Sequence, residues 1–154
     1  MRLDDFVLYL DENLNRCKPI LAALETHHVR YELHEAHFPR GTDDDEWLPF
    51  VAQRFWIVLT KDKRNRYNEL ERKAVQRFAV KEFYFASGNF NGHEMAAALI
   101  SAISKMKQIC STEEPPFVGS IARGGEITIV YDKHGSTHER RKKEREKAKS
   151  TNAS

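Results

Sequence analysis

Short runs of apolar residues alternate along this chain with segments whose apolar residues recur every three or four positions. The runs lie at 6–10, 56–60 and 82–86. Short uninterrupted apolar runs are typical of strands that are covered on both faces. Alternating apolar and polar residues predict a further strand at 29–33, and a terminal hairpin is expected from strands at 117–122 and 127–131.

The segments between these strands have the apolar spacing of amphipathic helices. We expect helices at 14–26, at about 42–53, at 68–79 and at 95–109. Thr42 to Asp45 fits a capping box, and Pro49 is acceptable in the first turn of the second helix, which then begins as late as Asp45. This alternation of strands and helices predicts an α/β fold of three layers, with a mostly parallel central sheet and helices on both faces.

Carboxylates follow two of the expected central strands. Asp11 stands directly after the first strand run and Asp62 two residues after the run at 56–60, and the acidic cluster 43–46 opens a helix near the same edge. Ligands of parallel sheets bind at the carboxyl ends of the strands. Carboxylates gathered there repel one another unless they share a hard cation such as Mg²⁺ or Mn²⁺, which can bind a phosphodiester oxygen and activate water. Basic residues flank the second acid and suit a polyanionic substrate: Lys61, Lys63, Arg64 and Arg66.

Each acid also has a structural explanation. Asp11 and Glu12 would be favourable in the first turn or cap of the helix that follows them, and the cluster 43–46 is equally suited to a helix N-terminus. Asp62 is harder to explain in this way, because it does not obviously cap the helix expected to begin near Asn68.

Composition indicates one ordinary domain with an appended tail. The chain has 154 residues, of which 40% are hydrophobic, and no run approaches the length of a membrane span. The N-terminal apolar run is too short for a signal peptide, and Cys17 and Cys110 are widely separated without metal-ligand spacing. We therefore expect a cytoplasmic protein without a disulfide framework or a structural zinc ion.

The charge of the chain is unevenly distributed. Residues 133–154 carry eight Lys/Arg and three acids, whereas residues 1–132 have a net charge of −3. We therefore expect a folded domain at 1–132 and a basic tail at 133–154 that is disordered or a fraying helix. Such a tail can bind RNA phosphates or can serve only to keep the protein soluble.

Histidines and aromatic residues are not expected to form the site. His34 and His37 are three residues apart on a strand-to-loop segment, where this spacing does not place both on one face for zinc. The aromatic residues are expected to be mostly core rather than an RNA-stacking platform. They are Trp47, Phe50, Phe55, Trp56, Phe78, Phe83, Tyr84 and Phe85.

Three short motifs together resemble the PIN-like nucleases. Residues 10–14 read LDENL, residues 41–48 are similar to a G-x-x-D-E-E-[IW]-L helix start, and residues 59–63 match [IL]-T-x-D-[KR] at a strand end. They come in the order and at the spacing of that family, and the resemblance covers roughly residues 6–110. It is closest to the VapC-type branch, small metal-dependent ribonucleases of prokaryotic toxin–antitoxin pairs.

The resemblance implies a Mg²⁺- or Mn²⁺-dependent endoribonuclease that would have RNA and an antitoxin protein as partners, no membrane association and possibly a homodimeric state. Asp11, Asp44 and Asp62 would bind the metal, with Glu12 and Thr60 in supporting roles. The chain departs from the family where many relatives have a further carboxylate, because Arg64 and Asn65 stand there. Substrate phosphate would be contacted by basic residues: Lys61, Arg64 and Arg66.

Two other functions fit parts of the pattern. A catalytically silent PIN-like protein that binds RNA or a partner would keep the fold without cleaving. A receiver-like phosphoacceptor also gathers acids at strand ends, but here the strand at 82–86 is followed by Ser87 and Gly88, and no Lys-Pro follows the last parallel strand. The first alternative therefore remains the main competitor of the nuclease.

Overall fold

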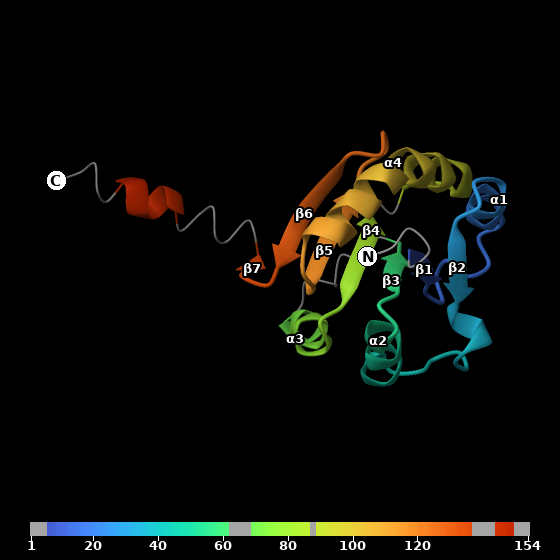
Figure 1. Cartoon of the computed structure of the whole chain (residues 1–154), viewed down its shortest axis with the longest axis horizontal. Helices are drawn as coiled ribbons and strands as arrows, with labels where there is room; N and C mark the ends of the chain where they lie inside the picture. Colours follow the sequence, from blue (N-terminus) through green and yellow to red (C-terminus); the bar gives the residue numbers. More distant parts are fainter. Residues whose placement is uncertain (1–5, 62–68, 87–88, 137–143, 150–154) are drawn as a thin grey trace.

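The structure is a computed structural model of the whole chain. It describes residues 6–61, 69–86, 89–136 and 144–149, with the backbone alone described at 69–72. Within these residues the chain forms one sheet with helices on both sides (Figure 1). No helix in the described part is both long enough and apolar enough to cross a membrane.

The sheet is parallel except at its C-terminal edge. Its spatial order in the described chain is β2-β1-β3-β4-β5-β6-β7. The pairs among β1 to β5 are parallel, whereas β6 and β7 are antiparallel to their neighbours. The strands are β1 (Val7–Leu10), β2 (Arg30–Leu33), β3 (Ile57–Thr60), β4 (Lys81–Phe85), β5 (Phe117–Ile121), β6 (Ile127–Asp132) and β7 (Gly135–Ser136).

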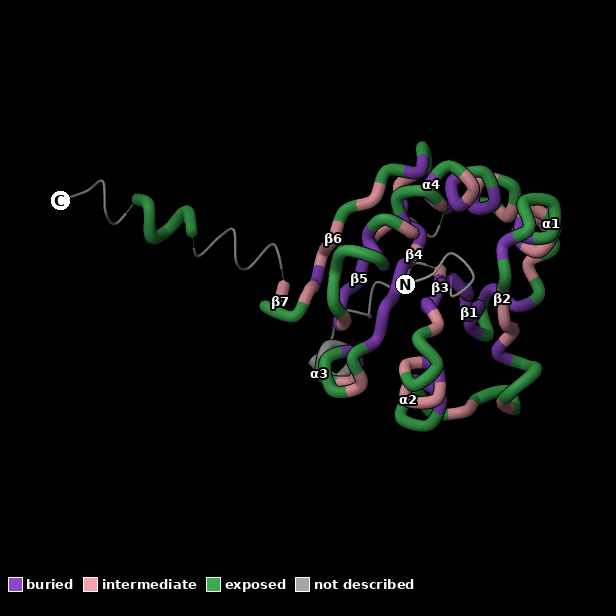
Figure 2. The backbone as a smooth tube through the Cα atoms, in the orientation of Figure 1, coloured by how far each residue is buried: buried purple, intermediate pink, exposed green. Residues whose placement is uncertain are grey.

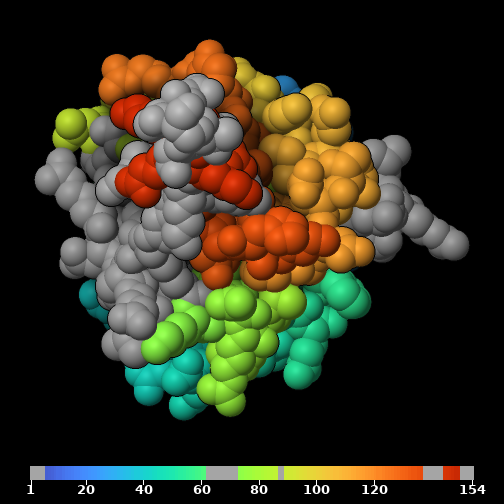
Figure 3. Space-filling model, turned by 90° about the vertical axis from the view of Figure 1, so that its left-hand side faces the viewer, coloured from blue at the N-terminus to red at the C-terminus, as the bar shows by residue number. Residues whose placement is uncertain are grey.

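Helices cover both faces of this sheet, as the order of elements predicts. The helices α1 (Lys18–Thr26) and α4 (Gly92–Thr112) pack together on one face, and α2 (Asp44–Gln53) and α3 (Glu69–Phe78) pack together on the other (Figure 1). Figure 3 shows α2 and α3 side by side, on the side of the molecule away from α4. A short 3₁₀ helix, η2 (His34–Ala36), follows β2 directly. The predicted three-layer α/β fold with a mostly parallel sheet is therefore confirmed.

Alternate residues of the central strands enter two separate cores. Leu8 and Leu10 of β1 pack with residues of α1 and α4, whereas Tyr9 packs with residues of α2 and α3. Every residue of β1 and β3 is buried, and the strands form the interior in Figure 2. This burial on both faces is the reason that β1 and β3 read as uninterrupted apolar runs.

The first helix begins later than its apolar spacing predicts. Backbone N–H groups of Leu14 and Asn15 donate to the carbonyl of Asp11, so the chain makes a turn after β1. The helix then starts at Lys18, with Pro19 in its first turn, where a missing N–H costs no helical hydrogen bond. The predicted start at residue 14 is wrong, because the buried Leu14 belongs to this turn and not to the helix.

Three other expectations about the α2 region are wrong. The N-cap is Asp43, and the Thr42 hydroxyl donates to the carbonyl of Pro39, so no capping box forms. Pro49 lies inside the helix, beyond its first turn. Phe55, expected in the core, is 65% exposed and has a positive φ of 58° just after the helix ends.

The C-terminal hairpin of β5 and β6 is confirmed. The antiparallel ladder continues into β7, where Ser136 pairs with Tyr131, so strand pairing extends a few residues past the predicted domain boundary at 132. Residues 144–149 form a short, exposed helical segment. The proposed boundary itself, and the properties of the tail at 133–154, stay predictions.

The close packing of β4 against β5 gives a test of the fold. A methyl group on Gly119 would lie 2.8 Å from two ring atoms of Phe83, which is fully buried and has no room to move. We expect Gly119→Ala to lower the free energy of unfolding by about 1–3 kcal/mol because of this overpacking. Urea denaturation measures the change, and Ser120→Ala on the same strand is the control. Equal stability of the two variants would contradict this packing.

Candidate active site

The order of the strands reverses between β1 and β3. The strands β2 and β3, which follow β1 in the chain, pair with opposite edges of β1, and both pairs are parallel. A crevice outside the carboxyl ends of the strands is expected at such a point. Asp11 follows β1 at this edge, and Thr60 is the last residue of β3.

Asp11 is a buried carboxylate that accepts hydrogen bonds from Thr60 and Asn13. The residue is 2% exposed. The Thr60 hydroxyl donates to its Oδ2, and the backbone N–H of Asn13 donates to its Oδ1 at 3.1 Å. The backbone N–H of Asp11 also donates to the Leu59 carbonyl at 3.4 Å, which extends the β1–β3 pairing by one residue. The carboxylate is therefore fixed at the switch point of the sheet.

Asp11 and Glu12 do not cap the following helix. The N-cap of α1 is Cys17, which makes no side-chain capping bond, and the first turn of α1 contains no acid. The alternative explanation of these two acids as helix-terminal residues is therefore wrong. Desolvating a carboxylate without such a role costs free energy, which the donors from Thr60 and Asn13 offset in part.

Asp44 is attached to the sheet through an aromatic contact. It is the first residue of α2, and its Oδ1 accepts from the indole N–H of Trp47 at 2.9 Å. The Trp47 ring stacks on Tyr9 with centroids 5.5 Å apart. Tyr9 and Trp47 belong to one core cluster, so Asp44 is attached to the face of the sheet to which Tyr9 points.

Glu12 connects the turn after β1 to the loop before α2. Its Oε1 accepts from the backbone N–H of Gly41 at 3.3 Å and lies 4.0 Å from Nε2 of His34. The side chain is about one-third exposed, so it stands at the rim of the crevice and not in its interior.

A buried Tyr9–His34 pair lies beneath this rim. The Tyr9 hydroxyl and His34 Nδ1 are hydrogen-bonded. Burial, and then the carboxylates of Asp11 and Glu12, raise the pKa of Tyr9. The sequence pattern led us to consider His34 only as a zinc ligand, and its hydrogen bond with Tyr9 was not expected. The signal for such a bond was Tyr9 itself, whose hydroxyl needs a partner inside a buried strand.

The other expected site residues are only partly described. Lys61 follows β3 and is half-buried. Asp62, Arg64 and Arg66 lie outside the described residues. Among the residues that the structure describes, no three His, Cys, Asp or Glu side chains are grouped as a metal site. Asp11 and Asp44 are the members of the expected trio that lie within the described residues.

A comparison with protein families decides the identity of this fold. The model of the PIN like domain matches residues 6–87, which is more than half of the chain. The chain belongs to the PIN-like domain family. The match runs from β1 to the end of β4 and includes the switch point with Asp11 and Thr60. PIN-like domains are generally nucleases. No curated protein and no solved structure matches this PIN-like chain significantly.

The hydroxyl that supports Asp11 gives a test of the site geometry. Thr60→Val keeps the shape of the side chain but leaves one buried oxygen of Asp11 without this donor. We expect it to lower the free energy of unfolding by about 1–3 kcal/mol. Thr60→Ser retains a hydroxyl and is the matched variant, in which most of the loss is restored. Thermal and urea denaturation compare the two, and a Val variant as stable as Ser would contradict the bond.

Proposed function

We propose that this PIN-like protein is a Mg²⁺- or Mn²⁺-dependent endoribonuclease of the VapC type, the toxin of a prokaryotic toxin–antitoxin pair. The observation that carries the proposal is Asp11, a buried carboxylate held by Thr60 at the switch point of a parallel sheet. A buried acid there contributes little to stability, because its desolvation is costly and it caps no helix. Its placement is better explained by a ligand.

The donor chemistry of this edge fits a hard divalent cation. Asp11 and Asp44 offer carboxylate oxygens, the ligands that Mg²⁺ and Mn²⁺ prefer, and both are already oriented by donors from the protein. Asp62, two residues beyond the end of β3, is the third acid that would hold the ion in this proposal. When bound, the ion supplies positive charge for a phosphodiester oxygen and lowers the pKa of a water molecule.

The chain itself would position the reacting groups. Thr60 fixes the orientation of Asp11, and Trp47 fixes that of Asp44, so neither acid must reorganise on binding. Glu12 would be a supporting acid at the rim of the site. Basic residues next to the third acid would hold substrate phosphate by charge: Lys61, Arg64 and Arg66.

The partners follow from the same proposal. RNA would be the substrate, and the basic tail at 133–154 would add phosphate contacts that weaken with salt. A cognate antitoxin would restrain the enzyme in the cytoplasm, and a homodimer is compatible with the toxin branch. An open reading frame for a small antitoxin-like protein beside the gene would support this assignment over a silent PIN-like binding protein.

Metal binding is the first test of the proposal. An ion that binds only the folded protein stabilises it by mass action, by about 2.7 kcal/mol at a hundredfold excess over its Kd. We therefore expect millimolar MnCl₂ to raise the melting temperature of the wild-type protein. The matched measurement on Asp11→Asn should show a much smaller rise. An unchanged melting temperature of the wild type in metal would remove the support for a cation site.

The second test compares two acids that differ in expected role. Asp62→Asn keeps the size of the side chain but removes the charge that would bind the cation, so cleavage of a mixed RNA substrate should fall by a factor of at least about 100. The folded state should survive, or gain stability from reduced carboxylate repulsion.

Asp43→Asn is the matched control for that substitution. Asp43 is the N-cap of α2, is exposed and makes no side-chain capping bond, so both stability and turnover should stay close to those of the wild type. Melting curves with metal and single-turnover cleavage are measured on all three proteins. A stable Asp62→Asn protein that cleaves as fast as the wild type would refute the nuclease assignment.

A further inference from the structure

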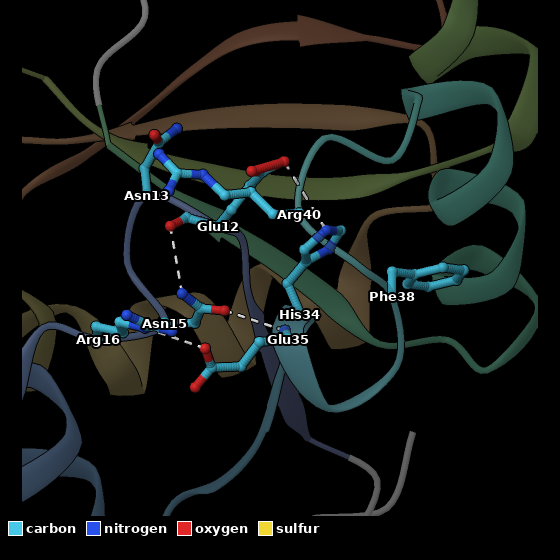
Figure 4. A pocket seen from close by; sticks show the side chains of 8 residues that line it. All are labelled: Glu12, Asn13, Asn15, Arg16, His34, Glu35, Phe38 and Arg40. Carbon is cyan, nitrogen blue, oxygen red and sulfur yellow. Dashed lines mark hydrogen bonds and ion pairs between the residues drawn. The ribbon is translucent and has the colours of Figure 1, made fainter.

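A cavity of about 260 Å³ opens beside the candidate metal edge (Figure 4). It lies between the turn that follows β1, the start of η2 and the loop before α2. Because Glu12 is the neighbour of Asp11 in the chain, the cavity adjoins the place where a scissile phosphate would be bound. Its lining residues are Glu12, Asn13, Asn15, Arg16, His34, Glu35, Phe38 and Arg40.

His34 gives this cavity a polar group that the described protein does not satisfy. The side chain is 2% exposed, and its Nδ1 is occupied by the Tyr9 hydroxyl. Nε2 is buried and has no hydrogen-bond partner in the part of the chain that the structure describes; the carboxylate of Glu12, at 4.0 Å, is too far away to be one. Buried polar atoms in native proteins are nearly always paired. A polar atom of a ligand in the cavity would pair this nitrogen.

The rest of the wall carries charges of both signs. Arg16 and Arg40 present guanidinium donors, and Glu12 and Glu35 present carboxylate acceptors. Arg16 Nε and Glu35 Oε2 are 3.1 Å apart, but these side chains are 86% and 45% exposed, so the pair is held weakly and can be exchanged for ligand contacts. A phosphate in this cavity would face two carboxylates, which disfavours a simple anion.

Asn15 ties together the backbone segments that carry the two carboxylates. Its Nδ2 donates to the backbone carbonyl of Glu12 at 3.2 Å, and its Oδ1 accepts from the backbone N–H of Glu35 at 3.0 Å. Asn15 is itself buried. The two acidic residues therefore stand on backbone segments that are tied to each other, as Figure 4 shows, and a recognition site requires such pre-organisation.

We propose that this cavity is a nucleobase subsite that selects guanine in single-stranded RNA. Guanine has two adjacent acceptors, O6 and N7, which match an arginine fork, and two adjacent donors, N1–H and N2–H₂, which match a carboxylate. Adenine, cytosine and uracil do not have both pairs. The volume lies just below the range of about 300–1,000 Å³ that is usual for small-molecule sites, which suits a single base. Unstacked bases are the usual targets of sequence-specific RNA recognition.

This inference rests on the proposed RNA substrate, but its test does not need catalysis. Full-length protein without metal is titrated with GMP, AMP, CMP and UMP, and binding is followed by the backbone amide NMR signals of the residues that line the cavity. We expect GMP to bind at least about fivefold more tightly than each of the other three. Inorganic phosphate should not compete with GMP.

Variants of exposed lining residues separate recognition from folding. Arg40→Ala and Glu35→Gln should each weaken GMP binding by at least about fivefold while leaving the melting temperature within about a degree of the wild type. Arg30→Ala is the control, because Arg30 is exposed at the amino end of β2, away from the cavity. It should bind GMP like the wild type.

The outcomes distinguish this inference from the proposed function. Equal binding of the four nucleotides, competition by phosphate, or unchanged GMP binding in both cavity variants would overturn the guanine subsite. Cleavage of RNA without a preference for guanine next to the cut, together with such a result, would leave the nuclease and remove the subsite. Selective GMP binding by a protein that cleaves no RNA would support the subsite and overturn the nuclease.

Discussion

The candidate site depends on one hydrogen bond across the centre of the sheet, from the Thr60 hydroxyl to the carboxylate of Asp11. It joins β1 to β3 at the point where the strand order reverses. Both residues are buried, so the bond replaces water that the carboxylate has lost. Because β1 and β3 are parallel neighbours, the residues that follow the two strands lie at the same edge of the sheet. The candidate metal site is built around this contact.

An aromatic layer joins that contact to the second helical face. Tyr9 stacks with Trp47, and its hydroxyl contacts His34, so one residue of β1 links α2 to the segment after β2. The same indole that stacks on Tyr9 donates to Asp44. A single core cluster thus orients an acid on one side and an imidazole on the other. Stability and positioning of the site are therefore coupled through the packing of these rings.

The two sides of this edge have different chemistry. The groups near Asp11 that could bind a ligand are carboxylate oxygens, which suit a hard cation and the phosphodiester that would bind to it. A few residues away, Arg40 and Glu35 line a cavity of mixed charge whose lining includes His34, with its buried Nε2. The first arrangement suits a sequence-independent backbone, and the second suits the edge of a base. In nucleic-acid recognition generally, backbone contacts position the partner and base contacts select it.

The sequence by itself determined the layers and the acids at strand ends. Buried runs such as 6–10 and 56–60 are unambiguous, because a strand covered on both faces has no polar side, and the acids Asp11 and Asp62 stand at the breaks of such runs. Only the tertiary structure decided where α1 begins, since the turn at Asp11 competes with helical periodicity through local backbone bonds. It also decided that Thr60 meets Asp11 and Tyr9 meets His34. These pairs are 49 and 25 residues apart, and chain pattern carries no information on contacts that depend on strand order and register.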